Sequence, residues 1–155
     1  MNREPQDIQL ACFNLGANLF AVDIMRIKEI ILPQKLYGLP RSSQLLDGVI
    51  NLRGAVIPVM DMRNRFGMTP LAEGKNGKLL IVCLSRQMLA LAVDDVMEVI
   101  SVPAREIKPP PDVAEGVGRE YLVGVCLSGE SVFMVLDVDV LLGPADYREI
   151  ARISA

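Results

Sequence analysis

The sequence contains no histidine among its 155 residues, so the side chain most often used for acid–base catalysis and metal binding is absent. The three cysteines, Cys12, Cys83 and Cys126, stand singly within apolar segments and form no zinc-type or Cys-x-x-Cys spacing. The sequence also lacks a phosphate loop, a Gly-x-Ser-x-Gly elbow and a dinucleotide fingerprint. These absences argue against most enzyme classes and predict neither a metal nor a cofactor.

Long hydrophobic runs are absent as well. The longest, Leu79 to Leu84 and Met88 to Val93, are far shorter than the roughly 18 apolar residues that span a bilayer. The first residues do not follow the pattern of a secretory signal. A net charge of −3 and the lack of a basic cluster argue against nucleic acid as a partner. We therefore expect a cytoplasmic protein that does not insert into the membrane.

The chain does contain an internal duplication. Leu46 to Met62 and Leu122 to Val138 share a Leu-x-Gly-Val opening, a Leu-x-Gly turn and a closing strand with an aspartate. Gly48 corresponds to Gly124, and Asp61 corresponds to Asp137 at the same spacing. Upstream of each copy, Cys12 to Asp23 aligns without gaps with Cys83 to Asp94, and both stretches end in Ala-Val-Asp. This self-similarity predicts two related units of roughly 65 residues, with Cys12 and Cys83 at equivalent, buried places.

The two copies differ at positions that the fold does not require. Ser128 and Met134 of the second copy stand where the first copy has Arg53 and Pro58. The segment Asn-Leu-Arg-Gly, residues 51–54, is therefore more than a turn sequence, and its arginine is a candidate functional residue.

The apolar patterns predict mainly strands. Ile24 begins a stretch in which either a helical turn or a strand fits, and we favour a strand over Arg26 to Ile31. The residues from Pro144 to Ala155 predict a terminal helix with Tyr147, Ile150 and Ala151 on one side. Four hairpins are predicted: Leu10 to Leu15 with Leu19 to Val22, Val49 to Leu52 with Ala55 to Met60, Leu79 to Leu84 with Met88 to Val93, and Val123 to Leu127 with Val132 to Leu136.

Many short strands separated by glycine are typical of small closed barrels. Strands that are apolar on both faces need cover on both sides, which a second barrel supplies. We therefore predict an all-β fold of two pseudo-symmetric barrels packed together, with a short C-terminal helix. The expected organisation is one domain over residues 1–155, with subdomains at about 8–66 and 78–142 and a tail at 143–155.

The segment Gly48-Val-Ile-Asn-Leu-Arg-Gly54, followed by Ile57 to Arg63 and by Phe66-Gly67, resembles the signature of the CheW-type chemotaxis coupling proteins. Flanking motifs extend the resemblance over nearly the whole chain, with one departure at Asp95, where the family often has glycine. The resemblance implies two five-stranded SH3-like barrels without catalytic activity. It also implies an adaptor that couples the cytoplasmic tips of chemoreceptors to the regulatory domain of a histidine kinase, itself a paralogous double barrel.

Four residues match family positions linked to partner binding: Ile27, Glu29, Arg53 and Val93. We assign them to the receptor. The alternative for Ile27 and Val93 is core burial, and the alternative for Arg53 is a turn arginine that stacks on its own barrel. We also predict that Arg53 and Glu29 approach each other near the surface.

Because the kinase's regulatory domain resembles this protein, we expect it to dock on the end or edge of the first barrel. We expect the receptor to dock in the groove near the barrel junction. Residues 38–54 form the first such end, with Leu39, Leu45 and Val49 as its apolar centre. Residues 115–130 form the second end, which carries Val117, Tyr121 and Leu122.

Two alternatives stay open. The same adaptor role would also suit a pilus-motility or surface-sensing pathway. More remotely, a small carboxylate-based enzyme or a ligand-binding barrel would use Asp94, Asp95, Asp137 and Asp139. That alternative requires two of these carboxylates to share a cleft and to have raised pKa values.

Overall fold

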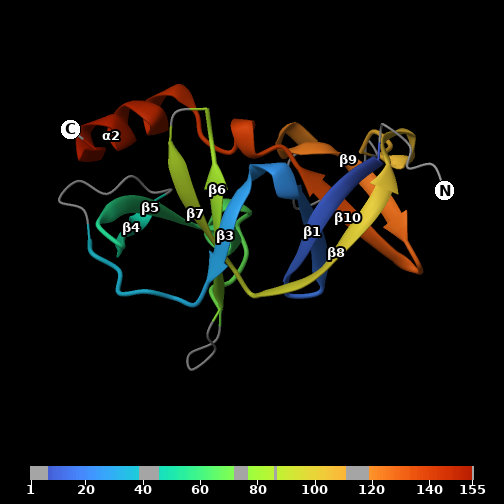
Figure 1. Ribbon diagram of the computed structural model, residues 1–155, viewed down its shortest axis with the longest axis horizontal. Helices are drawn as coiled ribbons and strands as arrows, with labels where there is room; N and C mark the ends of the chain where they lie inside the picture. The colour runs from blue at the N-terminus through green and yellow to red at the C-terminus, as the bar shows by residue number, and fades with distance from the viewer. Residues whose placement is uncertain (1–6, 39–45, 72–76, 86, 111–118, 155) are drawn as a thin grey trace.

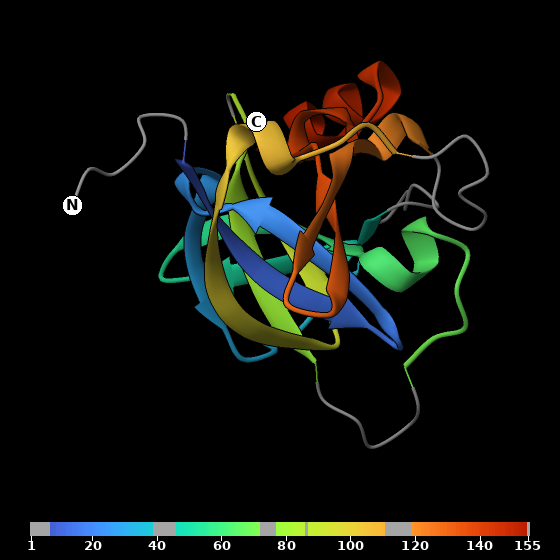
Figure 2. The same cartoon turned by 90° about the vertical axis from the view of Figure 1, so that its right-hand side faces the viewer.

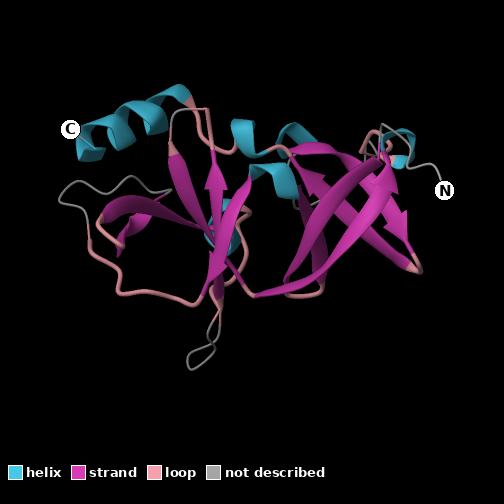
Figure 3. Cartoon of the chain, viewed as in Figure 1, coloured by secondary structure: helices cyan, strands magenta, loops and turns pink. Residues whose placement is uncertain are grey.

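The computed structural model describes residues 7–38, 46–71, 77–85, 87–110 and 119–154, which are mostly β-strands joined by short helical turns (Figures 1 and 3). The strands are β1 (Asp7–Leu15), β2 (Asn18–Asp23), β3 (Ile27–Ile31), β4 (Leu46–Leu52), β5 (Ala55–Asp61), β6 (Lys78–Cys83), β7 (Met88–Val93), β8 (Asp95–Pro103), β9 (Leu122–Ser128) and β10 (Ser131–Leu136). The helices are η1 (Ile24–Arg26), α1 (Met62–Arg65), η2 (Ala104–Glu106), η3 (Arg119–Tyr121), η4 (Val138–Val140) and α2 (Pro144–Ser154).

The strands form two five-stranded sheets, and the chain passes from the first sheet to the second and back again. The first sheet has the order β8-β1-β2-β10-β9 and the second has the order β3-β6-β7-β5-β4. Each sheet therefore combines two strands of one sequence repeat with three strands of the other. The subdomains expected at 8–66 and 78–142 do not coincide with these sheets, because the second sheet runs from Ile27 to Val93 and the first takes the strands on either side.

The predicted strands are present. All four hairpins form, and η1 supplies the helical turn that was the alternative at the start of β3. Strand β8, helix α1 and the turns η2 to η4 were not predicted. The predicted C-terminal helix is α2, which packs Tyr147 and Ile150 on the core while Ala151 is exposed. In the end-on view one sheet lies behind the other, with α2 at the top (Figure 2).

Within each sheet, the two edges approach each other and are joined by an isolated pair of hydrogen-bonded residues. Tyr37 and Val49 exchange backbone hydrogen bonds of 2.8 and 2.9 Å, and Lys108 and Val125 exchange two of 2.8 Å. Val49 and Val125 follow directly after the paired glycines Gly48 and Gly124, so the two bridges are repeat equivalents. At either glycine a Cβ atom would overlap the carbonyl oxygen of Tyr37 or Lys108. The glycines that recur in both copies are needed for this close approach.

The buried apolar side chains of the described residues form three clusters. A large cluster between the sheets takes side chains from both of them and contains the row of stacked rings Phe13, Phe20 and Phe66, with centroids 5.5 and 5.4 Å apart. Each sheet also has a smaller cluster of its own, and the two match position by position: Leu10, Cys12, Ala21, Cys126, Phe133 and Val135 in one, and Leu79, Ile81, Ala90, Ile50, Ile57 and Val59 in the other.

Strand pairing corrects the alignment of the upstream repeat. Ala21 lies beside Val135, and Ala90 lies beside Val59, the repeat equivalent of Val135. Ala21 therefore corresponds to Ala90, whereas the gapless sequence alignment had placed it opposite Ala92. By the same register Cys12 corresponds to Ile81, since these residues pair with the two alanines. The prediction that Cys83 is buried like Cys12 was wrong: Cys83 ends β6 and is exposed.

Candidate protein-binding site

The turn between β4 and β5 carries the main candidate, Arg53. Leu52 and Ala55 pair directly, so Arg53 and Gly54 form a two-residue hairpin loop. Both have positive φ, 50° for Arg53 and 89° for Gly54, as a type I′ turn requires. The Asn51 side chain accepts a hydrogen bond of 2.9 Å from the amide of Gly54 and holds the turn. An arginine is an unfavourable residue here, because the left-handed conformation costs a residue with a Cβ about 1–2 kcal/mol.

The second copy makes the equivalent turn differently. Ser128 pairs with Ser131, so the loop there consists of Gly129 and Glu130. Gly129 is therefore the counterpart of Arg53, and the assignment of Ser128 to this place was wrong by one position. Gly129 has a φ of 61°. One copy thus uses the residue that the backbone favours, while the other uses an arginine that the backbone disfavours.

The predicted approach of Arg53 to Glu29 is confirmed. Their side chains form an ion pair between Nη2 of Arg53 and Oε2 of Glu29. Glu29 is on β3 and Arg53 follows β4, so the pair connects the two outermost strands of the second sheet. The arginine side chain is 67% exposed and the glutamate 26%. Such a pair adds only about 0–1 kcal/mol to stability, but it holds the guanidinium plane on an accessible surface.

The other two residues assigned to the receptor lie deeper. Ile27, the first residue of β3, is half-buried and packs against the cluster between the sheets. Val93 is only 3% exposed and belongs to that cluster. The structure thus brings Arg53 and Glu29 together and places Ile27 two positions away on the same strand as Glu29. Val93 lies in the core, which was the alternative for it.

Two exposed apolar side chains lie beside Val49, with the Lys35 ammonium over one of them, the Tyr37 ring. Val49 is half-buried on β4, while Leu36 and Tyr37 beside it are each 46% exposed. Sequence reasoning missed these two residues, because the segment after β3 has no strand pattern. Leu39 and Leu45 lie outside the described residues.

At the second end the exposed apolar residues are Val123 and Leu127, and not the residues that were predicted. Tyr121 and Leu122 pack into the cluster between the sheets, so they do not form an exposed apolar centre. They were proposed for that role together with Val117, which lies outside the described residues.

The four carboxylates of the remote alternative do not gather. Asp137 accepts a hydrogen bond from the Asp139 amide at the start of η4, and Asp95 accepts one from the amide of Val96. The bidentate hydrogen bonds from Arg63 hold the pKa of Asp94 below its usual range, and those from Arg26 do the same for the pKa of Asp139. Lowered pKa values suit ion pairs and not general acids. Asp95 keeps an ordinary negative φ, so the glycine usual in the family is not needed for the backbone there.

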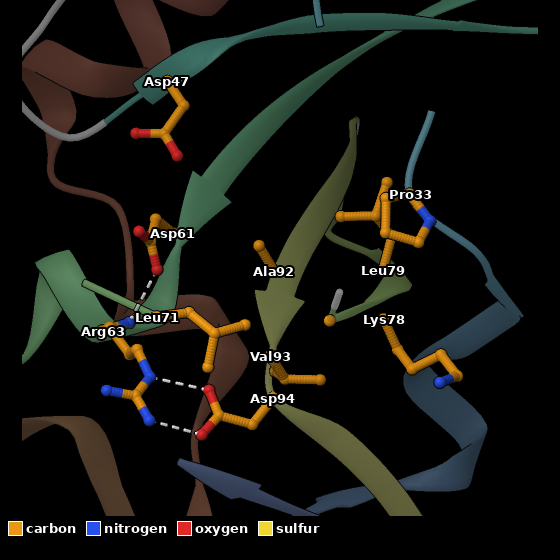
Figure 4. A pocket seen from close by; sticks show the side chains of 11 residues that line it. Pro33, Asp47, Asp61, Arg63, Leu71, Lys78, Leu79, Ala92, Val93 and Asp94 are labelled. Carbon is orange, nitrogen blue, oxygen red and sulfur yellow. Dashed lines mark hydrogen bonds and ion pairs between the residues drawn. The ribbon is translucent and has the colours of Figure 1, made fainter. Parts of the chain in front are cut away.

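One cleft of about 250 Å³ lies beside the Arg63–Asp94 ion pair (Figure 4). Its polar lining includes Asp47 and Asp61. Burial, followed by the nearby charge of Asp61, raises the pKa of Asp47. Of the four candidate carboxylates only Asp94 reaches this cleft, where it is already paired. Within the described residues we find no group of side chains that would hold a metal ion. None of the described helices has the length and apolar content to cross a membrane.

The chain thus combines two five-stranded sheets with an exposed arginine at a turn of the second sheet. The family model for the CheW-like domain matches residues 9–145, and the chain belongs to this family. The chain is 31% identical over 152 residues to a chemotaxis protein CheW of Treponema pallidum, covering 96% of this chain and 89% of that protein. It is 28% identical over 142 residues to a CheW of Klebsiella aerogenes, with coverages of 92% and 86%.

A solved structure agrees with this family. The scaffolding protein TtCheW from Thermoanaerobacter tengcongensis superposes with a TM-score of 0.82 and 27% identity over 92% of each chain.

Proposed function

We propose that this chain is a non-catalytic adaptor that links the cytoplasmic tips of chemoreceptors to the regulatory domain of a chemotaxis histidine kinase. One observation carries the proposal. Arg53 occupies a left-handed turn position where the other copy has glycine, and it remains exposed while Glu29 orients it. A residue kept against its backbone preference is best explained by what its side chain contacts outside the molecule.

The receptor surface would centre on Arg53, Glu29 and Ile27. Arginine is frequent among the few residues that dominate binding energy, because its planar fork makes several directed hydrogen bonds. Glu29 limits the positions of that fork, so less side-chain freedom is lost on binding. Val93 would not contact the receptor itself, and its packing in the core would support this surface.

The kinase surface would lie around Val49, where Leu36 and Tyr37 expose apolar area near the bridge between the sheet edges. Leu39 and Leu45, from the sequence, complete this candidate set. Two separate patches allow one chain to hold both partners at once. Weak contacts of this kind assemble an array when many act together.

The receptor assignment is tested by replacing Arg53 with alanine and, separately, with glycine. Both variants lose the guanidinium, so we expect both to bind a receptor cytoplasmic fragment at least about tenfold more weakly, a loss of roughly 1.4 kcal/mol in binding. Their stabilities should differ, because glycine relieves the left-handed backbone by about 1 kcal/mol relative to alanine. Titration calorimetry and thermal unfolding measure the two effects.

The exposed Arg148 on α2 supplies a matched control, since Arg148→Ala removes the same charge elsewhere. Binding that stays unchanged in both Arg53 variants contradicts the assignment. Binding that follows stability, with glycine near the wild type and alanine weak, would show a structural residue instead.

The two-patch arrangement has its own test. Leu36→Asp and Leu39→Asp should weaken binding of the kinase's regulatory domain and spare the receptor fragment, while Ile27→Asp should do the reverse. If all three weaken both partners equally, the chain has a single shared surface.

A further inference from the structure

Two arginine–aspartate pairs occupy similar places in the duplicated fold, and an arginine in one copy stands where the other copy has an aspartate. Arg63 and Asp139 are repeat equivalents, because each comes two positions after a capping aspartate, Asp61 or Asp137, and these aspartates correspond in the two copies. Their partners, Asp94 and Arg26, lie where the chain crosses from one sheet to the other. Asp94 and Arg26 therefore each bind the segment that follows the last strand of a repeat. Asp94 binds it as the anion and Arg26 as the cation.

Each pair also binds the tip of a hairpin. The carboxylate of Asp94 accepts hydrogen bonds of 2.7 and 2.5 Å from Arg63 and one of 2.7 Å from the amide of Gly16, between β1 and β2. We name these three groups the α1 clamp, of which Figure 4 shows the two side chains Arg63 and Asp94. It holds α1, which follows β5 of the second sheet, against the β1–β2 hairpin of the first sheet.

The second set, which we name the η1 clamp, consists of Arg26, the carboxylate of Asp139 and the carbonyl of Cys83. The guanidinium donates to both Asp139 oxygens at 2.8 and 2.5 Å and twice to the Cys83 carbonyl at 3.1 and 3.0 Å. Cys83 ends β6 of the second sheet, and Asp139 lies on η4, which follows the first sheet. The η1 clamp thus joins both sheets at the residue that immediately precedes β3.

The two clamps differ in burial. Arg63 and Asp94 are 16% and 12% exposed, whereas Arg26 and Asp139 are 33% and 51% exposed. An ion pair as exposed as the second adds little to global stability. Its bidentate geometry, however, fixes the direction of the arginine and of the backbone that carries it.

Strand β3 needs such support at its start. It is short, spanning Ile27 to Ile31, lies at the edge of its sheet and, among the described strands, pairs only with β6. The register shifts between Ile27 and Glu29, so the ladder is interrupted at the two residues of the receptor surface. Apart from the pairing of Ile27 with Val82, the η1 clamp is the connection among the described residues that holds this end of β3 to β6.

We propose that Arg26 and Asp139 are positioning residues: the η1 clamp holds the start of β3 so that Ile27 and Glu29 keep their places on the receptor surface. The proposal rests on the adaptor function and adds a pair outside the contact surface to it. Neither residue needs to touch the partner. Their loss acts through the direction of β3.

The test uses the full chain with Arg26→Gln, Asp139→Asn, the double variant and Arg26→Lys, and Arg148→Ala as the control. Each single neutral variant should weaken binding of a receptor fragment by about threefold to tenfold, and the double variant should be no weaker than the worse single one. Arg26→Lys keeps the charge and should retain more affinity than Arg26→Gln. Binding of the kinase's regulatory domain should stay within about twofold.

Amide hydrogen exchange supplies a readout that does not need a partner. Residues 27–31 should exchange faster in the neutral variants, while β7 and β10 keep their protection. If wild-type protein binds no receptor fragment, the proposed function fails, and the exchange data alone decide whether the clamp holds β3. The proposal is overturned if the neutral variants keep wild-type affinity and wild-type exchange. It is also overturned if the losses of affinity add in the double variant, or if both partners are weakened equally.

Discussion

Replacing Asp94 with asparagine tests how the two sheets are held together. The change keeps the shape of the side chain but removes the charge of the α1 clamp. An asparagine oxygen can still accept the hydrogen bond from Gly16, so the loss is confined to the interaction with Arg63. The Arg63 guanidinium, 16% exposed, is left with its bond of 2.8 Å to the Thr69 carbonyl.

The size of the effect follows from burial. Removing one partner of a fully buried ion pair costs about 3–5 kcal/mol, and an exposed pair contributes about 0–1 kcal/mol. Since both side chains of the α1 clamp are less than one-fifth exposed, we expect a loss of about 2–4 kcal/mol. A chain of 155 residues has an unfolding entropy of about 0.33 kcal/mol/K. The melting temperature should therefore fall by about 6–12 °C.

Thermal unfolding followed by circular dichroism measures this change, and Asp139→Asn is the matched control at the exposed clamp. The control should lower the melting temperature by no more than about 3 °C. The double variant Arg63→Gln, Asp94→Asn should be less destabilised than the two single losses added, because no unpaired charge remains. Equal effects at the two clamps, or a shift below about 2 °C for Asp94→Asn, would refute the reasoning from burial.

Three further predictions concern acid, glycine and cysteine. Because the pKa of Asp94 is lowered in the folded protein, its charge contributes to stability above the ordinary aspartate pKa of about 3.9, and this contribution is lost as the pH falls below that value. The melting temperatures of wild type and Asp94→Asn should therefore converge between about pH 5 and about 2. Gly124→Ala should cost about 1–3 kcal/mol in denaturant unfolding, because its Cβ would meet the Lys108 carbonyl, whereas Gly38→Ala, with open space around it, should be nearly neutral. A maleimide should label the exposed Cys83 rapidly and the buried Cys12 only on unfolding. Burial, with smaller contributions from nearby charges, raises the pKa of Cys12 to about 11 and so suppresses its reactive thiolate. Equal labelling rates for the two cysteines would contradict the burial of Cys12.

The strands were well predicted from the sequence because their apolar periods and glycine turns are local signals. The four hairpins depend on residues close in the chain, and each was found. The exchange of strands between the sheets could not be read in this way, because the pairing of β1 with β8 or of β3 with β6 joins residues far apart in sequence. The repeat suggested two separate halves, and only the register of the parallel pairs shows how the copies interlock.

The candidate site was predictable in part. The contrast between Arg53 and a small residue in the other copy singled out the arginine, and the ion pair with Glu29 followed from the expectation that both lie in one barrel. The burial of Val93 and the exposure of Leu36 and Tyr37 depend on tertiary packing, which local composition does not determine. The clamps were missed because their charged residues stand in connections, where single charges usually face water.

An adaptor of the proposed kind must hold a receptor and a kinase on one chain at the same time. Sedimentation velocity on a mixture of this chain, a receptor cytoplasmic fragment and the kinase's regulatory domain tests that requirement most directly. We predict a ternary species that forms only when all three are present and that disappears with Arg53→Gly. Two binary complexes that exclude each other, or a receptor–kinase complex that forms equally well without this chain, would contradict the adaptor function.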